Sequence, residues 1–281
     1  MSRIALILIF LVARSGPVFG QSFAPRSFDA AGRSLFADNS ADISRGPTPE
    51  IAFPVTLPRM APELALQVYH GRSVLQAQQL AAYSAVTVIR AELPETAQQG
   101  EFELQRHFEA PRTLQFTALH YTGDGFVKTN VITRLLQSEV DHVKQDDSAL
   151  TAISNANYKF SFKGTTEIHG RLTHVYQLKP RKKRPGLFKG RLYLDAHTGS
   201  IVRAEGSVVK SPSFFVKKIE FVQDYEDIGN FTFPTHIHTN ALARVIGRTV
   251  VDIFHRDYQP VSAPGMQSAF GIWPPSVIPS E

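Results

Sequence analysis

The alternation of apolar and polar residues predicts one helix followed by a long series of strands. Between Pro62 and Tyr83, leucine, valine and tyrosine recur among alanines and glutamines, and Pro62 suits the first turn of a helix. Shorter stretches of alternating character then follow, each ended by a proline, a glycine or a polar turn. In one of them Phe102, Leu104 and Arg106 share a face. The first predicted strands are Ser84–Leu93, Gly100–Phe108 and Leu114–Tyr121.

A second helix interrupts the strands. In Val131–Lys144, apolar residues recur at spacings of three and four, which is typical of one helical face. Strands then resume, with no helix between most neighbours, so the pattern predicts an antiparallel meander instead of βαβ units. The protein is therefore expected to be mainly β (α+β), a curved antiparallel sheet with helices over one face. The later strands are predicted at Tyr158–Lys163, Thr173–Lys179, Phe188–Leu194, Ser200–Val209, Phe214–Tyr225, Thr235–Ala241 and Arg244–Tyr258.

The two ends of the chain differ from this pattern. Residues 1–20 carry Arg3, ten apolar residues from Ile4 to Ala13, and small residues before Gln21, which predicts a cleaved signal peptide and an exported, periplasmic protein. Ten apolar residues are about half of what a membrane span needs. Residues 21–59 predict a flexible leader, residues 60–259 the domain, and residues 260–281, with five prolines, a tail.

Composition narrows the chemistry. The 281 residues are 43% hydrophobic and 20% charged, as in folded globular proteins, and there is no cysteine. Disulfides, thiolate zinc sites and cysteine nucleophiles are thereby excluded. The chain also lacks a Walker-type loop, a G-x-G-x-x-G fingerprint and a G-x-S-x-G elbow. We therefore expect no enzyme and no cofactor.

The positive charge is concentrated in one segment. The chain carries 30 Lys and Arg against 25 Asp and Glu, and seven of the basic residues lie between Lys179 and Arg191 with no acid among them. Because prolines and a glycine interrupt this run, it predicts a loop between two strands that docks on an anionic membrane surface or an envelope protein partner. A solvated loop is the alternative, and an exported protein meets little nucleic acid. The docking candidates are Arg181, Lys182, Lys183, Arg184, Leu187 and Phe188.

Aromatic residues are concentrated in the predicted strands. A half-closed sheet with aromatic side chains on its inner face would accept acyl chains, each buried CH₂ contributing about 0.8 kcal/mol. The alternative is that these rings only fill the core. The candidates for such a groove are Phe160, Phe162, Tyr176, Tyr193, Phe221 and Tyr225.

Two histidines are weak candidates for a metal site. His236 and His238 lie two apart on a predicted strand, so their side chains share a face. Asp252 or His255 on the next strand would have to supply a third ligand. Two solvated histidines on an outer face are the alternative, and we assign no metal.

The order of elements resembles the LolA/LolB-like superfamily of periplasmic lipoprotein carriers and related envelope proteins. The most similar piece is Gly190–Glu205 (GRLYLDAHTGSIVRAE), in which a strand ends at Asp195, turns at Thr198-Gly199 and returns. The resemblance extends from Pro62 to Tyr258, and the leader and the proline-rich tail depart from it. It implies an incomplete antiparallel barrel capped by helices, whose concave face holds a lipid, a lipoprotein acyl chain or another hydrophobic ligand without catalysis. A groove that binds a partner protein is the alternative, and a histidine-based metal enzyme is a third.

Overall fold

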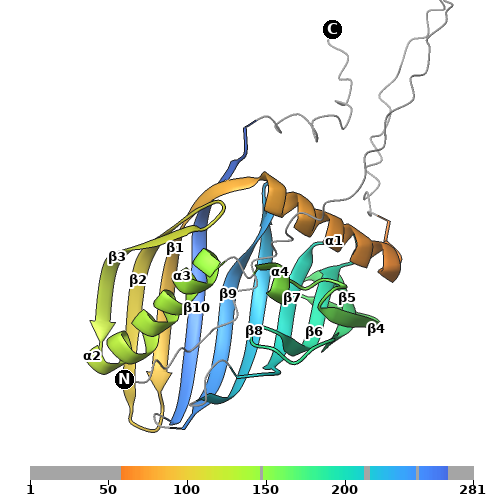
Figure 1. The fold of residues 1–281 in the computed structure, drawn as a ribbon. Coiled ribbons are helices and arrows are strands. Elements are labelled where there is room, and N and C mark those ends of the chain that lie inside the picture. The colour runs from red at the N-terminus through yellow and green to blue at the C-terminus, as the bar shows by residue number, and fades with distance from the viewer. Residues whose placement is uncertain (1–57, 146–147, 212–215, 245–246, 265–281) are drawn as a thin grey trace, which may run out of the picture. The chain divides into compact units, whose positions relative to one another are not determined.

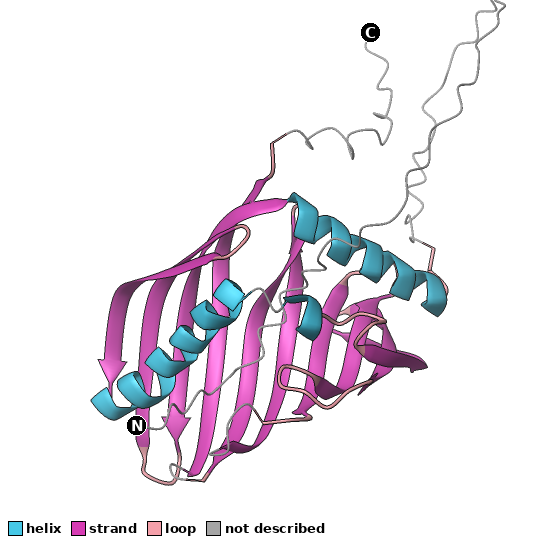
Figure 2. Ribbon diagram, viewed as in Figure 1, coloured by secondary structure: helices cyan, strands magenta, loops and turns pink. Residues whose placement is uncertain are grey.

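A ten-stranded antiparallel sheet organises the protein in a computed structural model that describes residues 58–145, 148–211, 216–244 and 247–264. The strand order is β3-β2-β1-β10-β9-β8-β7-β6-β5-β4, so every neighbour is sequential except β1 and β10. The curved sheet and its helices are shown in Figures 1 and 2. The strands are β1 Leu80–Leu93, β2 Gln98–Glu109, β3 Thr113–Gly123, β4 Tyr158–Ile168, β5 Arg171–Pro180, β6 Phe188–Asp195, β7 Ile201–Val208, β8 Val216–Ile228, β9 Phe231–Ala243 and β10 Gly247–Ser262.

Helices lie against one face of this sheet, which we call the inner face (Figure 2). The long helix α1 spans Pro62–Gln79, and a second helical stretch runs through α2 (Gly125–Val127), a π-helical turn (Lys128–Ile132) and α3 (Thr133–Gln145). The short α4 spans Ser148–Thr151. None of the helices in the described part of the chain has the length and apolarity needed to cross a bilayer. The predicted mainly β class, with an open curved sheet, is confirmed.

The register shows why the inner face is the core. Ile89 of β1 lies opposite both Phe102 of β2 and Ile253 of β10, and Ile253 lies opposite Ile237 of β9. Ile89, Ile253 and Ile237 are buried in one apolar cluster with Leu135 of α3. Successive side chains alternate between faces, so polar residues occupy the outer face, where Arg90 is bonded to Glu101.

Two further clusters complete the inner face. One joins Tyr69 of α1 to β4–β8 through Tyr158, Leu192 and Phe221. The other lies at the α1 end of the sheet, where Tyr83 packs against Phe108, Phe231 and Phe233. The inner face therefore has an α3 side over β1–β3 and an α1 side over β6–β8.

The first helix is shorter than the sequence predicts. It ends at Gln79, and Leu80–Tyr83 belong to β1, where the ring of Tyr83 stacks on that of Phe108 with a centroid distance of 5.2 Å. Burial of Leu80 and Tyr83 against the sheet outweighs the helical periodicity of the segment.

The boundary at residue 260 also differs. β10 continues through Pro260 to Ser262, so the strand runs into the predicted tail. Its ladder with β9 ends at Phe254, whereas the ladder with β1 pairs Tyr83 with Pro260. A proline fits there because one edge of the strand no longer pairs with β9. The predicted signal peptide, the leader up to residue 57 and the tail from residue 265 lie outside the described residues.

Candidate ligand-binding site

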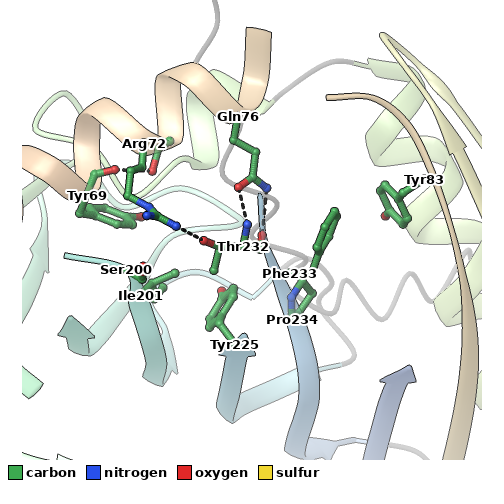
Figure 3. Close-up of a pocket in the computed structure, with 11 residues that line it drawn as sticks. Tyr69, Arg72, Gln76, Tyr83, Ser200, Ile201, Tyr225, Thr232, Phe233 and Pro234 are labelled. Atoms are coloured by element: carbon green, nitrogen blue, oxygen red, sulfur yellow. Dashed lines mark hydrogen bonds between the residues drawn. The ribbon is translucent and has the colours of Figure 1, made fainter. Parts of the chain in front are cut away.

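A pocket lies between α1 and the inner face, near the hairpin that joins β8 to β9 (Figure 3). Its volume is about 30 Å³. Since one water needs roughly 10–15 Å³, it holds about two waters and no acyl chain. A larger ligand does not fit the pocket in this conformation. The lining residues are Tyr69, Arg72, Ser73, Gln76, Tyr83, Ser200, Ile201, Tyr225, Thr232, Phe233 and Pro234.

Polar contacts hold α1 over this pocket. The amide of Gln76 donates to the Thr232 carbonyl and accepts from the Thr232 N–H, both at 2.9 Å. One turn earlier, the guanidinium of Arg72 lies 2.9 Å from the Asp227 carboxylate. Asp227 also accepts hydrogen bonds from the hydroxyls of Ser200 and Thr232, each at 2.5 Å. These bonds join α1 to the β8–β9 hairpin and to the start of β7.

The floor of the pocket is aromatic and contains a buried hydroxyl. Tyr225 is 6% exposed, and its hydroxyl has no hydrogen-bond partner among the described residues. Burial raises the pKa of Tyr225 well above its ordinary value, and the nearby Tyr69 adds to the shift. A buried hydroxyl that makes no hydrogen bond costs about 1–3 kcal/mol. Tyr225 is therefore available to donate to a polar group of a bound molecule.

More unpaired polar groups lie along β8 and β9. Gln223 is buried on the inner face two residues before Tyr225, and neither polar atom of its amide has a partner in the described part of the chain. The buried Thr239 hydroxyl on β9 also has no hydrogen-bond partner among the described residues. The inner face beside the pocket is therefore apolar in bulk, with hydrogen-bonding groups at a few points.

An ion pair holds α3 to the other side of the inner face. Arg106 of β2 contacts Glu139 of α3, both side chains are buried, and Arg106 also donates to the hydroxyl of Tyr83 at 2.9 Å. Burial raises the pKa of Glu139, while the guanidinium opposes that rise. The sequence analysis placed Arg106 on an apolar face but did not identify Glu139. Its position could have been noticed, because Glu139 is an acid between Leu135 and Val140 on the apolar side of the predicted helix.

The predicted groove residues fall into two sets. Tyr176, Phe221 and Tyr225 are buried in the α1-side cluster, with Phe160 packed against it. Phe162 of the edge strand β4 lies on the same face but is 43% exposed. Tyr193 lies opposite Val175, on the outer face, where its hydroxyl donates to Glu205 at 2.7 Å. Its neighbours Leu192 and Leu194 face the core, so alternation excludes Tyr193 from an inner groove.

The predicted docking residues differ in burial: two are buried and the others lie at the surface or bond to neighbouring residues. Leu187 and Phe188 are fully buried in the α1-side cluster, so the prediction that they contact a membrane is wrong. Phe188 begins β6 with its ring on the inner face, and Leu187 is the last loop residue before the strand. Arg181 donates to the carbonyl of Asn155, and Arg184 donates to the side chain of Asn157. Lys182 and Lys183 are exposed.

The two histidines that were weak candidates for a metal site both contact Asp252. His236 lies 3.0 Å and His238 2.9 Å from the same carboxylate oxygen of Asp252. His255 is buried on the inner face, where it bonds the hydroxyl of Thr87 at 2.8 Å. In the described ranges no group of three such side chains is arranged to hold a metal ion.

Comparison with known proteins finds neither a matching family model nor a similar curated protein. Among solved structures, the chain is similar to a DUF1329 family protein from Desulfovibrio piger, with a TM-score of 0.38 and 10% identity over 70% of this chain and 92% of that one. For a putative outer membrane lipoprotein-sorting protein domain from Vibrio parahaemolyticus, the TM-score is 0.37 and the identity is 10%, over 73% of this chain and 95% of that one.

A LolA superfamily protein, NE2245 from Nitrosomonas europaea, gives a TM-score of 0.35 and 11% identity over 73% of this chain and 96% of that one. At this level of likeness, nothing about ligands, partners or catalysis passes from those proteins to this chain.

Proposed function

We propose that this protein is an exported envelope protein that binds an amphiphilic hydrophobic molecule, such as a lipid or a lipoprotein acyl chain, on the inner face of its sheet. Binding involves no catalytic step. The observation that carries the proposal is the pocket under α1, which combines an aromatic floor with the buried, unpaired hydroxyl of Tyr225. Apolar walls suit the chain of such a ligand, and the hydroxyl suits a polar group near its head.

The helix α1 is a suitable cover for such a site. Of its 18 residues only Ala65 and Tyr69 are buried, and its bonds to the β8–β9 hairpin are made by side chains of Arg72 and Gln76. A helix held in this way can separate from the sheet without breaking a strand ladder. The site would then enlarge toward the apolar clusters on either side.

Binding of the fluorescent fatty acid cis-parinaric acid tests the proposal. Fluorescence should rise saturably in the wild type, and native mass spectrometry of the protein isolated from an envelope fraction should show a bound lipid. Ser73→Leu places a larger side chain in the pocket and should weaken binding at least tenfold.

The matched control is Val74→Leu on the same helix, because Val74 is 39% exposed and does not line the pocket. It should bind as the wild type does. Urea unfolding of both variants shows whether the sheet is intact. A wild type that binds no fatty acid and carries no lipid would refute the proposal, and so would equal binding by both variants.

A further inference from the structure

Where β4–β8 end on the side of the sheet opposite α1, the described residues carry almost only positive charge. This end of the sheet comprises the ends of β4–β8 and the loop between β5 and β6, within residues 158–163, 178–190, 207–211 and 216–220. The one acid in these described segments is Glu220. We call this surface the cationic end; its basic residues are Lys159, Lys163, Lys179, Arg181, Lys182, Lys183, Arg184, Lys189, Lys210, Lys217 and Lys218.

Lysines stand side by side on the outer face of this end. Lys159 of β4 lies directly opposite Lys179 of β5. Lys189 of β6 comes one residue before Gly190, the partner of Leu178, so it continues the row. All three are exposed. Like charges directly opposite on neighbouring strands destabilise a sheet, so this row costs the isolated protein stability that an anionic partner would restore.

The neighbouring loop presents two more lysines on a fixed backbone. Arg181 and Arg184 bond to Asn155 and Asn157, and the loop ends at the fully buried Leu187. Lys182 and Lys183 therefore point to solvent from a segment that is fastened at both ends. The end of β7 and the start of β8 lie at the same end of the sheet, because β5 and β7 run in the same direction.

We propose that the cationic end docks the protein on the surface of an anionic phospholipid bilayer. Lysine dominates this surface, and lysine is depleted in protein–protein interfaces, which use arginine and aromatic anchors. The apolar residues that the sequence offered as such anchors, Leu187 and Phe188, are buried. A surface of exposed point charges on the outer face suits lipid headgroups, toward which each cation contributes about fivefold in affinity.

This inference does not depend on the proposed function. The lysine row is on the outer face, whereas the pocket under α1 is on the inner face at the other end of the strands. Vesicle binding and fatty-acid binding are therefore separate measurements, and either can fail while the other holds.

Cosedimentation with phosphatidylcholine vesicles, with and without phosphatidylglycerol, tests the docking surface. The protein should bind only the anionic vesicles and should be released by salt, since the screening length falls from about 10 Å at 0.1 M to about 3 Å at 1 M. Lys182→Gln/Lys183→Gln should weaken binding about 25-fold.

Lys159→Gln/Lys179→Gln should lower vesicle binding by a similar factor. Because this change removes a repulsion between neighbouring strands, the urea midpoint of unfolding should stay equal or rise, whereas a variant that damages the fold would unfold at lower urea. The charge-matched control is Arg112→Gln/Lys144→Gln, in the β2–β3 turn and on α3, which should bind as the wild type does. The proposal is overturned if the wild type ignores anionic lipid, or if the control weakens binding as much as the variants of the cationic end.

Discussion

The buried pair of Arg106 and Glu139 is the residue-scale contact that fixes α3 on the sheet. Two charges inside an apolar cluster are tolerated because each neutralises the other, and Tyr83 accepts a further hydrogen bond from the guanidinium. The stability of this region therefore depends on the pair more than on either member.

Arg106→Met or Glu139→Leu alone should lower the free energy of unfolding by about 3–5 kcal/mol, because each leaves one buried charge uncompensated. The double variant should be much less destabilised than the sum of the two singles. Urea unfolding of the four proteins measures this coupling. Additive losses would show that the two side chains act independently.

A buried histidine makes stability depend on pH. Burial holds the pKa of His255 well below its usual range, and the nearby Arg106 lowers it further. The unfolded chain binds a proton near pH 6.5 and the folded chain does not, so the contribution is present above about pH 6.5 and is lost as the pH falls below it.

The free energy of unfolding should fall by up to about 1.4 kcal/mol per pH unit below pH 6.5. His255→Gln removes the titrating group and should flatten this dependence between pH 6.5 and 5.5, although its stability at pH 8 is lower. Urea titrations at several pH values measure both slopes. The same slope in the variant would assign the dependence to other groups.

At the scale of elements, the turn between β6 and β7 supports α1. Gly199 has a φ of 68°, and a Cβ there would lie 2.8 Å from Val68 Cγ1 and 3.1 Å from the carbonyl oxygen of Ala65. The close approach of helix and turn thus requires glycine. Gly170, in the β4–β5 turn, has a similar φ of 73° with nothing within 4 Å of the same position.

Gly199→Ala and Gly170→Ala share the cost of a left-handed backbone, about 1–2 kcal/mol. Gly199→Ala should add a clash with α1, so it should be the less stable variant and should show faster hydrogen exchange in Pro62–Gln79. Gly170→Ala should leave that exchange unchanged. Equal exchange in the two variants would mean that the turn does not support the helix.

Most strands were predictable because apolar and polar residues alternate along them, as burial does along β1 and β10. Even Tyr193 could have been placed on the outer face by its position between Leu192 and Leu194. Contacts between residues far apart in the sequence could not be predicted in this way. Gln76 and Thr232 are 156 residues apart, and they meet because α1 precedes β1 and the strand order β1-β10-β9 places β9 near it. The burial of Leu187 was missed for the same reason, since a loop sequence does not show which cluster receives its last residue.

At the scale of the whole molecule, the proposed ligand site depends on whether α1 can leave the sheet. The closed pocket of about 30 Å³ is too small for an acyl chain, and the bonds of Gln76 to Thr232 close it. The chain has no cysteine, so a pair of introduced thiols can be cross-linked without competing reactions.

Gln76→Cys/Thr232→Cys can be joined by a short bifunctional cross-linker that contains a disulfide. The cross-linked protein should lose most of its capacity for cis-parinaric acid and regain it when a reducing agent cleaves the cross-link. The control bridge is Arg90→Cys/Glu101→Cys, which joins directly opposed residues on the outer face of β1 and β2 and leaves α1 untouched. It should bind the fatty acid whether bridged or reduced. If bridging α1 to β9 leaves binding intact, the ligand enters without movement of α1, and the entrance must lie on the α3 side of the inner face.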